Sequence, residues 1–424
     1  MTYELTVPER LLTWLDVERV FKQKTQLWTH LPEGVHSVDC YHDGVDIAHS
    51  VDEITVEAWL NGIFGKAFSV QPAQLHLRAG NGEYPVRLER VLAPIAARRL
   101  LPLYPLWREV AYLPVDESSA PYFQNLPVPF AGGPRMVSFH SFKGGVGRTT
   151  ALMTYVTARL HAVDAQKSVK VLVVDADLEA PGVTFWLDET NRPQVSFIQF
   201  LEAMHYPPVS AAASLDLLAE QLRKTSLDVG GQQRELFVLP AALDLVEIQD
   251  MPVQPGHLAR NPDNPWILTD RLHALGKRLG VDAVFMDLRA GLSEFASPVI
   301  FDPRVEHYFV TTVAKQSVSG LCEVLRRLHA FNSSQVREQP KPSVVISLLT
   351  KSWRESSVYG EAKELIESAY PLPNRGRGNE VAMDEGVEWQ EADFSESLMA
   401  IGSVREAFDV LRTSSLYGNG AQQW

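Results

Sequence analysis

Cysteine is scarce in this sequence: Cys40 and Cys322 are the two that occur, and they lie far apart. Two distant cysteines exclude a disulfide framework and a cysteine-rich zinc site, so we expect a reducing, cytoplasmic environment. Long apolar runs are also missing, because no stretch approaches the roughly 18 consecutive apolar residues of a membrane-spanning helix. The first residues lack a basic stretch followed by an apolar one. The sequence therefore predicts neither a signal peptide nor a membrane segment.

An excess of positive charge is absent as well. Lys and Arg number 39 against 52 Asp and Glu, which gives a net charge of −13. This balance excludes a globally basic nucleic-acid coat but not a local basic patch. Arg375 and Arg377 make a basic spot that is too small to predict DNA binding. A DNA-organising function is therefore only a weak alternative.

The chain of 424 residues is longer than one ordinary domain. Hydrophobic residues make up 45% and charged residues 21%, which is typical of a folded globular protein. Prolines recur through residues 114–134 together with Gly132 and Gly133. A stretch so rich in proline lacks backbone donors and predicts an extended linker. We therefore expect an N-terminal module over residues 1–113 and a second domain over residues 135–424.

The N-terminal module shows both helical and hairpin patterns. Apolar spacing predicts helices from Pro8 to about Lys24 and from Ile54 to Phe68. Alternating residues from Leu75 to Val91, around Gly80-Asn81-Gly82, predict a hairpin, so the module is expected to be small and α+β. Its tryptophans are interpreted as core anchors, with an exposed partner-binding surface as the alternative. They are Trp14, Trp28, Trp59 and Trp107.

Downstream of residue 135, strand-like and helix-like segments alternate. Strands are predicted at 136–140, 169–174, 235–239, 283–287, 307–312 and 343–349. Helices are predicted at 149–162, 195–204, 215–223, 266–279, 317–331, 360–369 and 395–413. Apolar strands that alternate with amphipathic helices predict an α/β fold, with a mostly parallel sheet covered by helices on both faces.

The segment from Met136 to Thr150 combines a strand, a glycine-rich loop and a helix. The strand Met136–His140 runs into Ser141-Phe-Lys-Gly-Gly-Val-Gly-Arg-Thr-Thr150. Glycines let the backbone turn tightly and direct N–H groups inward, and the helix N-terminus adds partial positive charge where phosphates would lie. Thr149 is placed to put its hydroxyl on Mg²⁺. The context predicts a phosphate-binding loop rather than a plain strand–helix turn.

The run Lys143-Gly-Gly-Val-Gly-x-Thr149-Thr150 resembles the deviant Walker A motif of the ParA/MinD-type P-loop NTPases of the SIMIBI class. The resemblance covers roughly residues 135–415 and implies an ATPase fold. It implies that Lys143 reaches the nucleotide across a dimer interface, so that ATP joins two copies and hydrolysis releases them. The residues that it implies for ATP binding are Lys143, Gly144, Gly145, Val146, Gly147, Arg148, Thr149 and Thr150.

The loop departs from the family pattern at Arg148, because the family normally has lysine there. Arginine keeps the positive charge, but its planar guanidinium is bulkier and less adaptable than a compact ammonium. Nucleotide binding is therefore expected to persist, and hydrolysis is expected to be slow or absent.

Two buried strands later in the chain end in acids. One leads into Asp175-Ala-Asp177, and the other leads into Asp287, with Gly291 four residues further on. Carboxylates at the carboxyl ends of strands face the crevice where ligands bind in open α/β sheets. Taken alone, these acids are equally expected as caps of the strand ends.

The acidic segments resemble switch I and the Walker B–switch II region of the same family. By this resemblance, Asp177 orients the attacking water and acts with Lys143 in catalysis. Asp175 and Asp287 serve the Mg²⁺ ion together with Thr149. Gly291 senses the γ-phosphate through its backbone N–H, which lets the loop move on hydrolysis.

Other residues are weaker candidates for chemistry. For Arg289, a surface salt bridge is expected in preference to a phosphate contact. Thr350 and Lys351 lie where the family often places nucleotide-base contacts, and a solvated loop is the alternative. The apolar face of the predicted C-terminal helix favours core packing over membrane binding, because its polar face is nearly charge-balanced. The sequence has no serine-nucleophile elbow. Four histidines lack the spacing of a zinc site: His30, His36, His42 and His49.

Two functions of different classes follow. The first is an ATP-hydrolysing molecular switch, which forms a homodimer with ATP and Mg²⁺ and couples to a protein partner through the N-terminal module. The alternative is a nucleotide-sensing scaffold with little or no hydrolysis, working by protein–protein interaction, for example in a bacterial signalling or defence system. The sequence does not distinguish ATP from GTP, because base contacts come from loops that it does not place.

Overall fold

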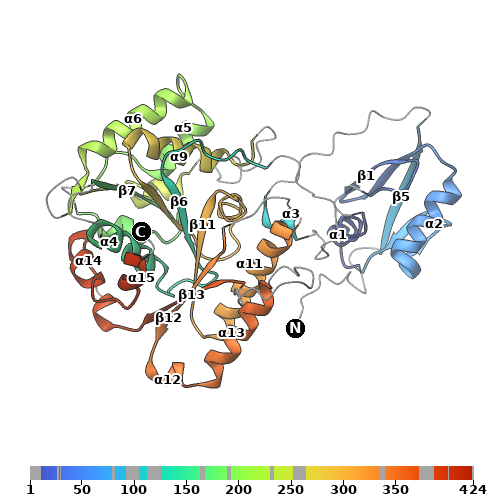
Figure 1. The fold of residues 1–424 in the computed structure, drawn as a ribbon. Coiled ribbons are helices and arrows are strands. Elements are labelled where there is room, and N and C mark those ends of the chain that lie inside the picture. Colours follow the sequence, from blue (N-terminus) through green and yellow to red (C-terminus); the bar gives the residue numbers. More distant parts are fainter. Residues whose placement is uncertain are drawn as a thin grey trace, which may run out of the picture. The chain divides into compact units, whose positions relative to one another are not determined.

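The computed structural model describes residues 11–25, 28, 30–78, 82–91, 105–111, 126–162, 168–188, 192–229, 234–251, 264–333, 340–371, 386–399 and 401–422. Contacts between residues divide the chain into two compact units. The first consists of Met1–Leu103 with Arg108–Ser119, and the second of Tyr104–Trp107 with Ala120–Trp424. Each unit has its own sheet (Figure 1).

The first unit is built on a five-stranded sheet in the order β1-β2-β5-β4-β3. Its strands are β1 (Val35–Tyr41), β2 (Gly44–His49), β3 (Phe68–Ser69), β4 (Gln74–His76) and β5 (Glu83–Arg90). The sheet packs with helices α1 (Trp14–Lys24) and α2 (Glu53–Phe64) and the 3-10 helix η1 (Gly65–Ala67). A short helix, α3 (Trp107–Val110), follows later in the chain. The unit is α+β, as predicted.

The predicted hairpin is confirmed, because β4 pairs antiparallel with β5. The two predicted helices are real but shorter. In α1 the side chain of Asp16 accepts the N–H of Thr13, and the helix begins at Trp14; residues 8–10 lie outside the described part of the chain. In α2 the helix ends at Phe64, because Gly65 has a positive φ of 52° that breaks the helical backbone.

Three of the four tryptophans pack against the core of the first unit, as expected, whereas Trp107, predicted with them, belongs to the second unit. Trp14, Trp28 and Trp59 are partly buried and pack against the core of the first unit. Trp107 is buried within the second unit, where its ring lies edge-on to Phe301 and its Nε1 donates to the carbonyl of Ser293 at 2.8 Å. The sequence patterns described above do not predict strands β1 and β2. The hydroxyl of buried Tyr84 holds their hairpin at its turn.

The second unit contains an eight-stranded sheet in the order β13-β12-β11-β6-β10-β7-β9-β8. All neighbouring strands are parallel except β8 and β9. The predicted α/β class with a mostly parallel sheet is therefore confirmed. The strands are β6 (Arg135–His140), β7 (Val169–Ala176), β8 (Leu227–Asp228), β9 (Arg234–Leu239), β10 (Ala283–Leu288), β11 (Val305–Thr311), β12 (Ser343–Leu349) and β13 (Glu388–Asp393).

Helices cover both faces of this sheet (Figure 1). On one face α4 packs with α14 and α15, and their buried side chains form a single core with the sheet. On the other face lie α6, α9 and α11, where Gly276 of α9 approaches the side chain of Val284. The helices are α4 (Arg148–Ala162), α5 (Phe197–His205), α6 (Ala211–Lys224), α7 (Leu245–Gln249), α9 (Ile267–Leu279), α10 (Ser297–Ile300), α11 (Lys315–Ser333), α12 (Lys351–Arg354), α13 (Ser357–Ala369), α14 (Val404–Leu411) and α15 (Leu416–Gln422), with 3-10 helices η2 (Val183–Trp186) and η4 (Glu396–Leu398).

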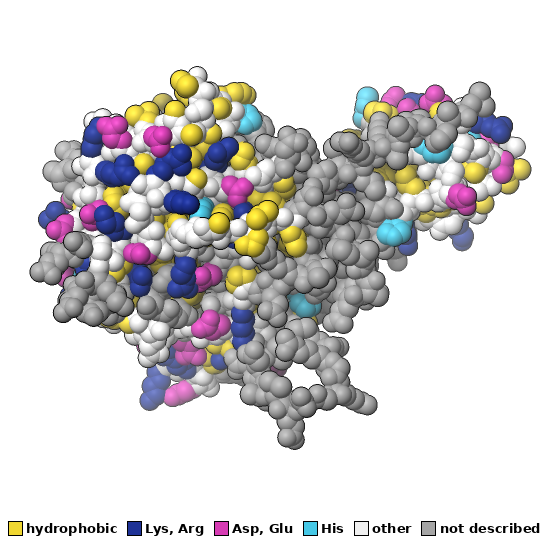
Figure 2. All heavy atoms as spheres, turned by 45° about the horizontal axis from the view of Figure 1, so that its top comes forward, with side chains coloured by type: hydrophobic (Ala, Val, Ile, Leu, Met, Phe, Trp, Pro, Cys, Tyr) yellow, Lys and Arg dark blue, Asp and Glu magenta, His cyan; other side chains and the backbone are white. Residues whose placement is uncertain are grey.

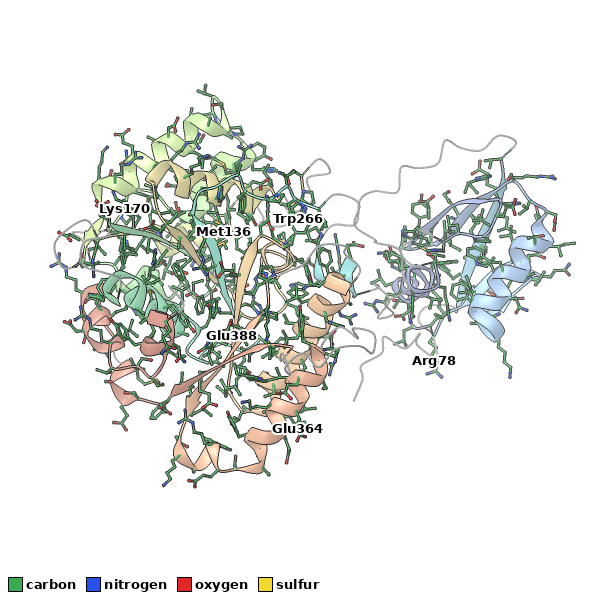
Figure 3. All side chains as sticks on the ribbon, viewed as in Figure 1. Arg78, Met136, Lys170, Trp266, Glu364 and Glu388 are labelled. Atoms are coloured by element: carbon green, nitrogen blue, oxygen red, sulfur yellow. The ribbon has the colours of Figure 1, made fainter. Side chains whose placement is uncertain are left out.

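Apolar side chains of the central strands fill the interior on both faces of this sheet. Met136, at the second position of β6, lies inside the unit and is 2% exposed (Figure 3). Strands buried on both faces read as continuous apolar runs, and for this reason their positions were predictable from the sequence.

One predicted helix, at 395–413, is wrong. The structure has η4 and then α14, which begins at Val404 after Ser403 accepts the N–H of Glu406 with its side chain. Gly402 separates the two, and a serine cap starts a new helix rather than continuing an old one. The core packing predicted for this segment is confirmed, because Phe408 and Leu411 of α14 are buried.

The surface of the second unit carries charges of both signs. Lys and Arg side chains gather in part of the face seen in Figure 2, interspersed with Asp and Glu. Charged side chains of this unit also form ion pairs, such as Arg278 with Asp216 and Lys224 with Glu220. Arg375 and Arg377 lie outside the described residues. In the part of the chain that the structure describes, no helix combines the length and the apolar character needed to cross a membrane.

Candidate functional site

Three adjacent strands bring the predicted site residues to one edge of the second sheet. Strand β10 lies between β6 and β7, so the loop after β6 and the acids at the ends of β7 and β10 meet. Asp287 of β10 is the register partner of Asp175 of β7 on one side and of Phe139 of β6 on the other. The two acidic motifs, which lie more than a hundred residues apart in the sequence, are therefore direct neighbours.

The glycine-rich loop joins β6 to α4 and depends on two glycines. Gly145 and Gly147 have φ angles of 73° and 80°, a conformation that side-chain-bearing residues rarely adopt. Val146 between them is buried, and its carbonyl accepts the hydroxyl of Ser347 at 2.5 Å. The loop is thus anchored to β12 through Val146, while Lys143 and Gly144 remain exposed.

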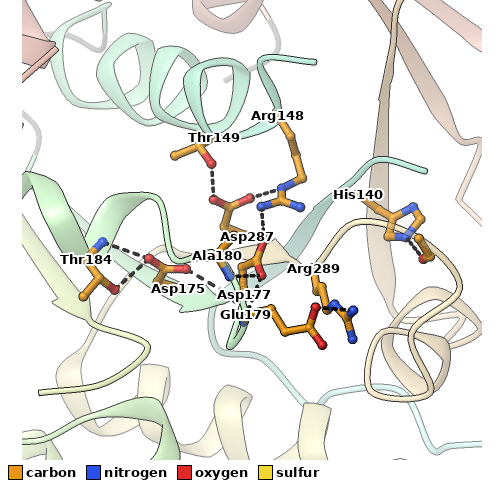
Figure 4. A network of polar contacts seen from close by, with 11 residues as sticks. His140, Arg148, Thr149, Asp175, Asp177, Glu179, Ala180, Thr184, Asp287 and Arg289 are labelled. Atoms are coloured by element: carbon orange, nitrogen blue, oxygen red, sulfur yellow. Dashed lines mark hydrogen bonds and ion pairs between the residues drawn. The ribbon is translucent and has the colours of Figure 1, made fainter. Parts of the chain in front are cut away.

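Arg148, the first residue of α4, bridges the two acidic motifs (Figure 4). Its Nε donates to Oδ1 of Asp287 at 2.5 Å, and one terminal nitrogen donates to Oδ2 of Asp177 at 2.8 Å. The side chains of the three residues are between 0% and 8% exposed. Thr149 donates its hydroxyl to the second oxygen of Asp287 at 2.6 Å. The first turn of α4 therefore contacts both oxygens of one carboxylate.

The two acids after β7 are held by different partners. Asp175 accepts the backbone N–H of Thr184 at 2.8 Å and its hydroxyl at 2.7 Å, which ties the end of β7 to η2. Oδ1 of Asp177 accepts the N–H of Ala180 at 3.0 Å and of Glu179 at 3.3 Å. Asp177 thus shapes its own turn and pairs with Arg148 at the same time.

Burial sets the charge states at this edge. Desolvation, together with the negative charge of Asp287, raises the pKa of Asp175 to about 7. For Arg148, burial acts to lower the pKa, but the attraction of Asp287 and Asp177 outweighs it and the pKa is raised. The site therefore holds the positive charge of Arg148 between Asp177 and Asp287. Beside them lies Asp175, whose carboxyl group titrates near pH 7.

Gly291 is fixed at both of its backbone polar groups. Its N–H donates to the carbonyl of Ser141 at 2.9 Å, and its carbonyl lies 2.9 Å from Nε2 of His140. Its φ is 86°, so the backbone here suits glycine. The N–H that was predicted to sense a γ-phosphate is engaged by the base of the glycine-rich loop in this structure. The sequence motifs do not single out His140, whose ring holds this carbonyl.

Two further glycines show where backbone and loop approach each other closely. A Cβ on Gly182 would lie 2.7 Å from Oγ1 of Thr149, so the segment after Asp177 passes directly against the first turn of α4. A Cβ on Gly320 of α11 would overlap the ring of Phe142 in the loop. The sequence offers only the glycines themselves as signals of these contacts, because each depends on a partner far away in the chain.

The remaining predicted residues are placed as follows. Arg289 pairs with Glu179 at the surface, which confirms the expected salt bridge (Figure 4). Thr350 caps α12 by accepting the N–H of Trp353, and Lys351 is largely exposed. Thr150, in the first turn of α4, is partly exposed. Predicted base contacts at 350 and 351 remain predictions.

The oxygen donors at this edge fit a divalent cation, whereas the guanidinium beside them does not. A hydroxyl from Thr149 and a carboxylate from Asp287 lie together, with Asp175 on the neighbouring strand, and Mg²⁺ prefers such oxygen ligands. Arg148 holds the other oxygen of Asp287. Within the described ranges, no three His, Cys, Asp or Glu side chains are gathered as a metal site. The same holds for the N-terminal histidines, His30, His36, His42 and His49, which are not gathered as a metal site.

The sequence matches no family model and no curated protein. Solved structures that are similar to it include a ParA family ATPase from Chlorobium tepidum TLS, which is 14% identical with a TM-score of 0.44 over 68% of this chain and 98% of that chain. A McdA variant from Cyanothece in complex with ATP is 15% identical, with a TM-score of 0.42 over 66% and 96%. The septum site-determining protein MinD with Mg-ADP, from Pyrococcus horikoshii OT3, is 18% identical, with a TM-score of 0.32 over 55% and 78%. These likenesses are distant.

Proposed function

We propose that this protein is an ATP-binding molecular switch whose nucleotide site lies at the carboxyl edge of the second sheet. The observation that carries the proposal is the meeting of three elements: the glycine-rich loop, the Asp175–Asp177 turn and the Asp287–Gly291 turn. A loop with left-handed glycines that opens a long helix suits phosphate oxygens, because its N–H groups carry partial positive charge. Acidic turns beside such a loop suit a response to the terminal phosphate.

The residues divide the work between binding and hydrolysis. Backbone groups from Gly144 to Thr150 bind the phosphates, and Lys143 supplies a charge from the exposed part of the loop. Asp177 orients the attacking water. Gly291 senses the terminal phosphate once its N–H leaves the carbonyl of Ser141, to which it donates in this structure. A Mg²⁺ ion held by Thr149, Asp175 and Asp287 would neutralise phosphate charge. Hydrolysis is expected to be slow, because Asp177 is engaged by Arg148 and by its own turn.

The proposal includes a homodimer that forms with ATP. Lys143 is exposed at the same edge, where a second copy is accessible to it. Large apolar side chains are also exposed on the segments that follow β7, β9 and β10, and burying such side chains favours association. They are Phe185, Leu245, Val246 and Leu292. The N-terminal unit, with its separate core, is proposed to couple the switch to a protein partner in the cytoplasm.

One observation favours the alternative, a nucleotide-sensing scaffold without useful turnover. Both carboxylate oxygens of Asp177 already accept hydrogen bonds, one from Arg148 and the other from backbone N–H groups. A carboxylate in this state has little capacity left to orient water. In this case the output of the site is a protein–protein contact rather than a hydrolysis cycle.

The molar mass in solution tests the proposal. It is measured without nucleotide, with ADP, with ATP and Mg²⁺, and with GTP and Mg²⁺, while phosphate release is followed on the same sample. A monomer of 47.3 kDa that doubles with ATP and reverts as phosphate appears supports the switch. Doubling with a phosphate rate equal to that of Asp177→Ala favours the scaffold. A molar mass that is the same with and without each nucleotide, together with no detectable nucleotide binding, refutes both functions.

A further inference from the structure

Arg148 lies between two buried carboxylates rather than over open space (Figure 4). It contacts Asp287 at 2.5 Å and Asp177 at 2.8 Å, and its side chain is 8% exposed. These two acids come from different strands, β10 and the end of β7. A single guanidinium therefore joins two segments that the proposed function assigns to metal binding and to water positioning.

Each oxygen of the two carboxylates already has a donor from the protein. Asp287 receives Arg148 on Oδ1 and the hydroxyl of Thr149 on Oδ2. Asp177 receives Arg148 on Oδ2 and the N–H of Ala180 on Oδ1. A divalent cation would have to approach the same oxygens, within a few ångströms of the guanidinium. Two cations at such a distance in a buried site repel each other, so the binding of one weakens the binding of the other.

The choice of arginine matters for this arrangement. Its planar fork presents several N–H donors in fixed directions, so one side chain reaches two acids at once. A lysine has a single ammonium on a flexible stem and holds two separated carboxylates less firmly. Removing a buried ion-pair partner also leaves an uncompensated charge, which a new cation then neutralises favourably.

We propose that Arg148 and a divalent cation compete for the carboxylates of Asp177 and Asp287, so that metal enters only when the arginine leaves. The choice of Mg²⁺ as the cation rests on the proposed function, but the competition concerns the protein without nucleotide. Arg148 thus determines whether this edge of the sheet binds metal, and it keeps the two acidic segments together in the metal-free protein.

Thermal unfolding of the nucleotide-free protein, in EDTA and with Mg²⁺ alone, tests the competition. The wild-type melting temperature is expected to stay the same on adding Mg²⁺. Arg148→Ala leaves two buried acids without a cation, so Mg²⁺ at about ten times its dissociation constant is expected to raise its melting temperature by roughly 2–4 °C. The matched double variant Arg148→Ala/Asp287→Asn, which lacks one of the acids, is expected to lose this rise.

Two results overturn the proposal: a rise in the wild type as large as in Arg148→Ala, or no rise in Arg148→Ala. If Arg148→Ala does not fold, Arg148→Lys replaces it. Mg²⁺ is then expected to raise its melting temperature more than that of the wild type, but less than the rise expected for Arg148→Ala. No rise in Arg148→Lys then overturns the proposal. Binding of a fluorescent ATP analogue to the wild type is measured separately. Its absence refutes the proposed function and leaves the Mg²⁺ comparison valid.

Discussion

At position 148, one side chain supplies the positive charge for two carboxylates that are 4% and 0% exposed. Removing one partner of a buried ion pair costs about 3–5 kcal/mol, because the remaining charge stays buried without compensation. We therefore expect Arg148→Met to lower the free energy of unfolding by about 3 kcal/mol or more, measured by urea denaturation in EDTA.

Arg289 provides the matched control for this prediction. It is also an arginine paired with an acid of the same segment, Glu179, but its side chain is 40% exposed. Surface ion pairs contribute about 0–1 kcal/mol because water screens them. Arg289→Met is therefore expected to change stability little, and equal losses in the two variants would contradict the burial argument.

His140 carries a prediction about pH. Burial lowers its pKa to about 4, whereas an unfolded histidine titrates near 6.5. Between these values the unfolded chain binds a proton that the folded chain does not, so stability falls as the pH falls, by roughly 1.4 kcal/mol per pH unit. His140→Gln removes this titration and keeps an N–H donor for the carbonyl of Gly291.

The measurement is the slope of the unfolding free energy between about pH 6.5 and 4. His140→Gln is expected to have a shallower slope than the wild type. His307, which is also buried with a lowered pKa, stays in both proteins. Its pKa is lowered in part by His140, so His140→Gln also removes this effect, which makes the slope shallower in the same direction. An unchanged slope in His140→Gln would refute the prediction.

Among the elements, α11 and α13 each contain one glycine with a different environment. A Cβ on Gly320 of α11 would overlap the ring of Phe142, whereas a Cβ on Gly360 of α13 would meet nothing within 4 Å. Alanine is the better helix former by about 0.5–1 kcal/mol, so Gly360→Ala is expected to stabilise the protein by that amount. Gly320→Ala is expected to destabilise it by roughly 1–3 kcal/mol, because Phe142 and the glycine-rich loop must move.

Chemical denaturation of the two variants in parallel checks this prediction. Stabilisation by both substitutions would mean that Phe142 has room to turn away from α11. In that case the loop does not depend on this helix for its position.

The central strands and the glycine-rich loop were predictable because their signals are local. A strand buried on both faces is a continuous apolar run, as in β7, and a loop needing left-handed backbone carries glycine, as at 145 and 147. Edge strand β13 was not predictable, because its residues include Glu388, Glu391 and Asp393. The partners of Arg148 and of Gly291 were not predictable either, since they depend on contacts between segments that are distant in the sequence.

For the whole molecule, the main prediction concerns association. If Lys143 reaches a nucleotide bound by a second copy, Lys143→Ala is expected to bind ATP but remain a monomer, with about half the molar mass of the wild-type dimer. The reason is that one ion contact across the interface is lost. Light scattering with ATP and Mg²⁺ measures this mass. Lys224→Ala, at another exposed lysine of the second unit, is the control and is expected to dimerise. A dimer of Lys143→Ala that persists with ATP contradicts the role of Lys143 across an interface.

The two outer strands of the eight-stranded sheet have a consequence for how the protein avoids unwanted aggregation. An open sheet edge offers unpaired backbone groups to any other strand. Here one edge is β8, a strand of two residues that runs antiparallel to its neighbour. The other is β13, which is rich in acids. A short strand and a charged strand both discourage continuation of the sheet into another molecule. Copies of this chain at high concentration are therefore expected to stay in solution rather than join into fibres.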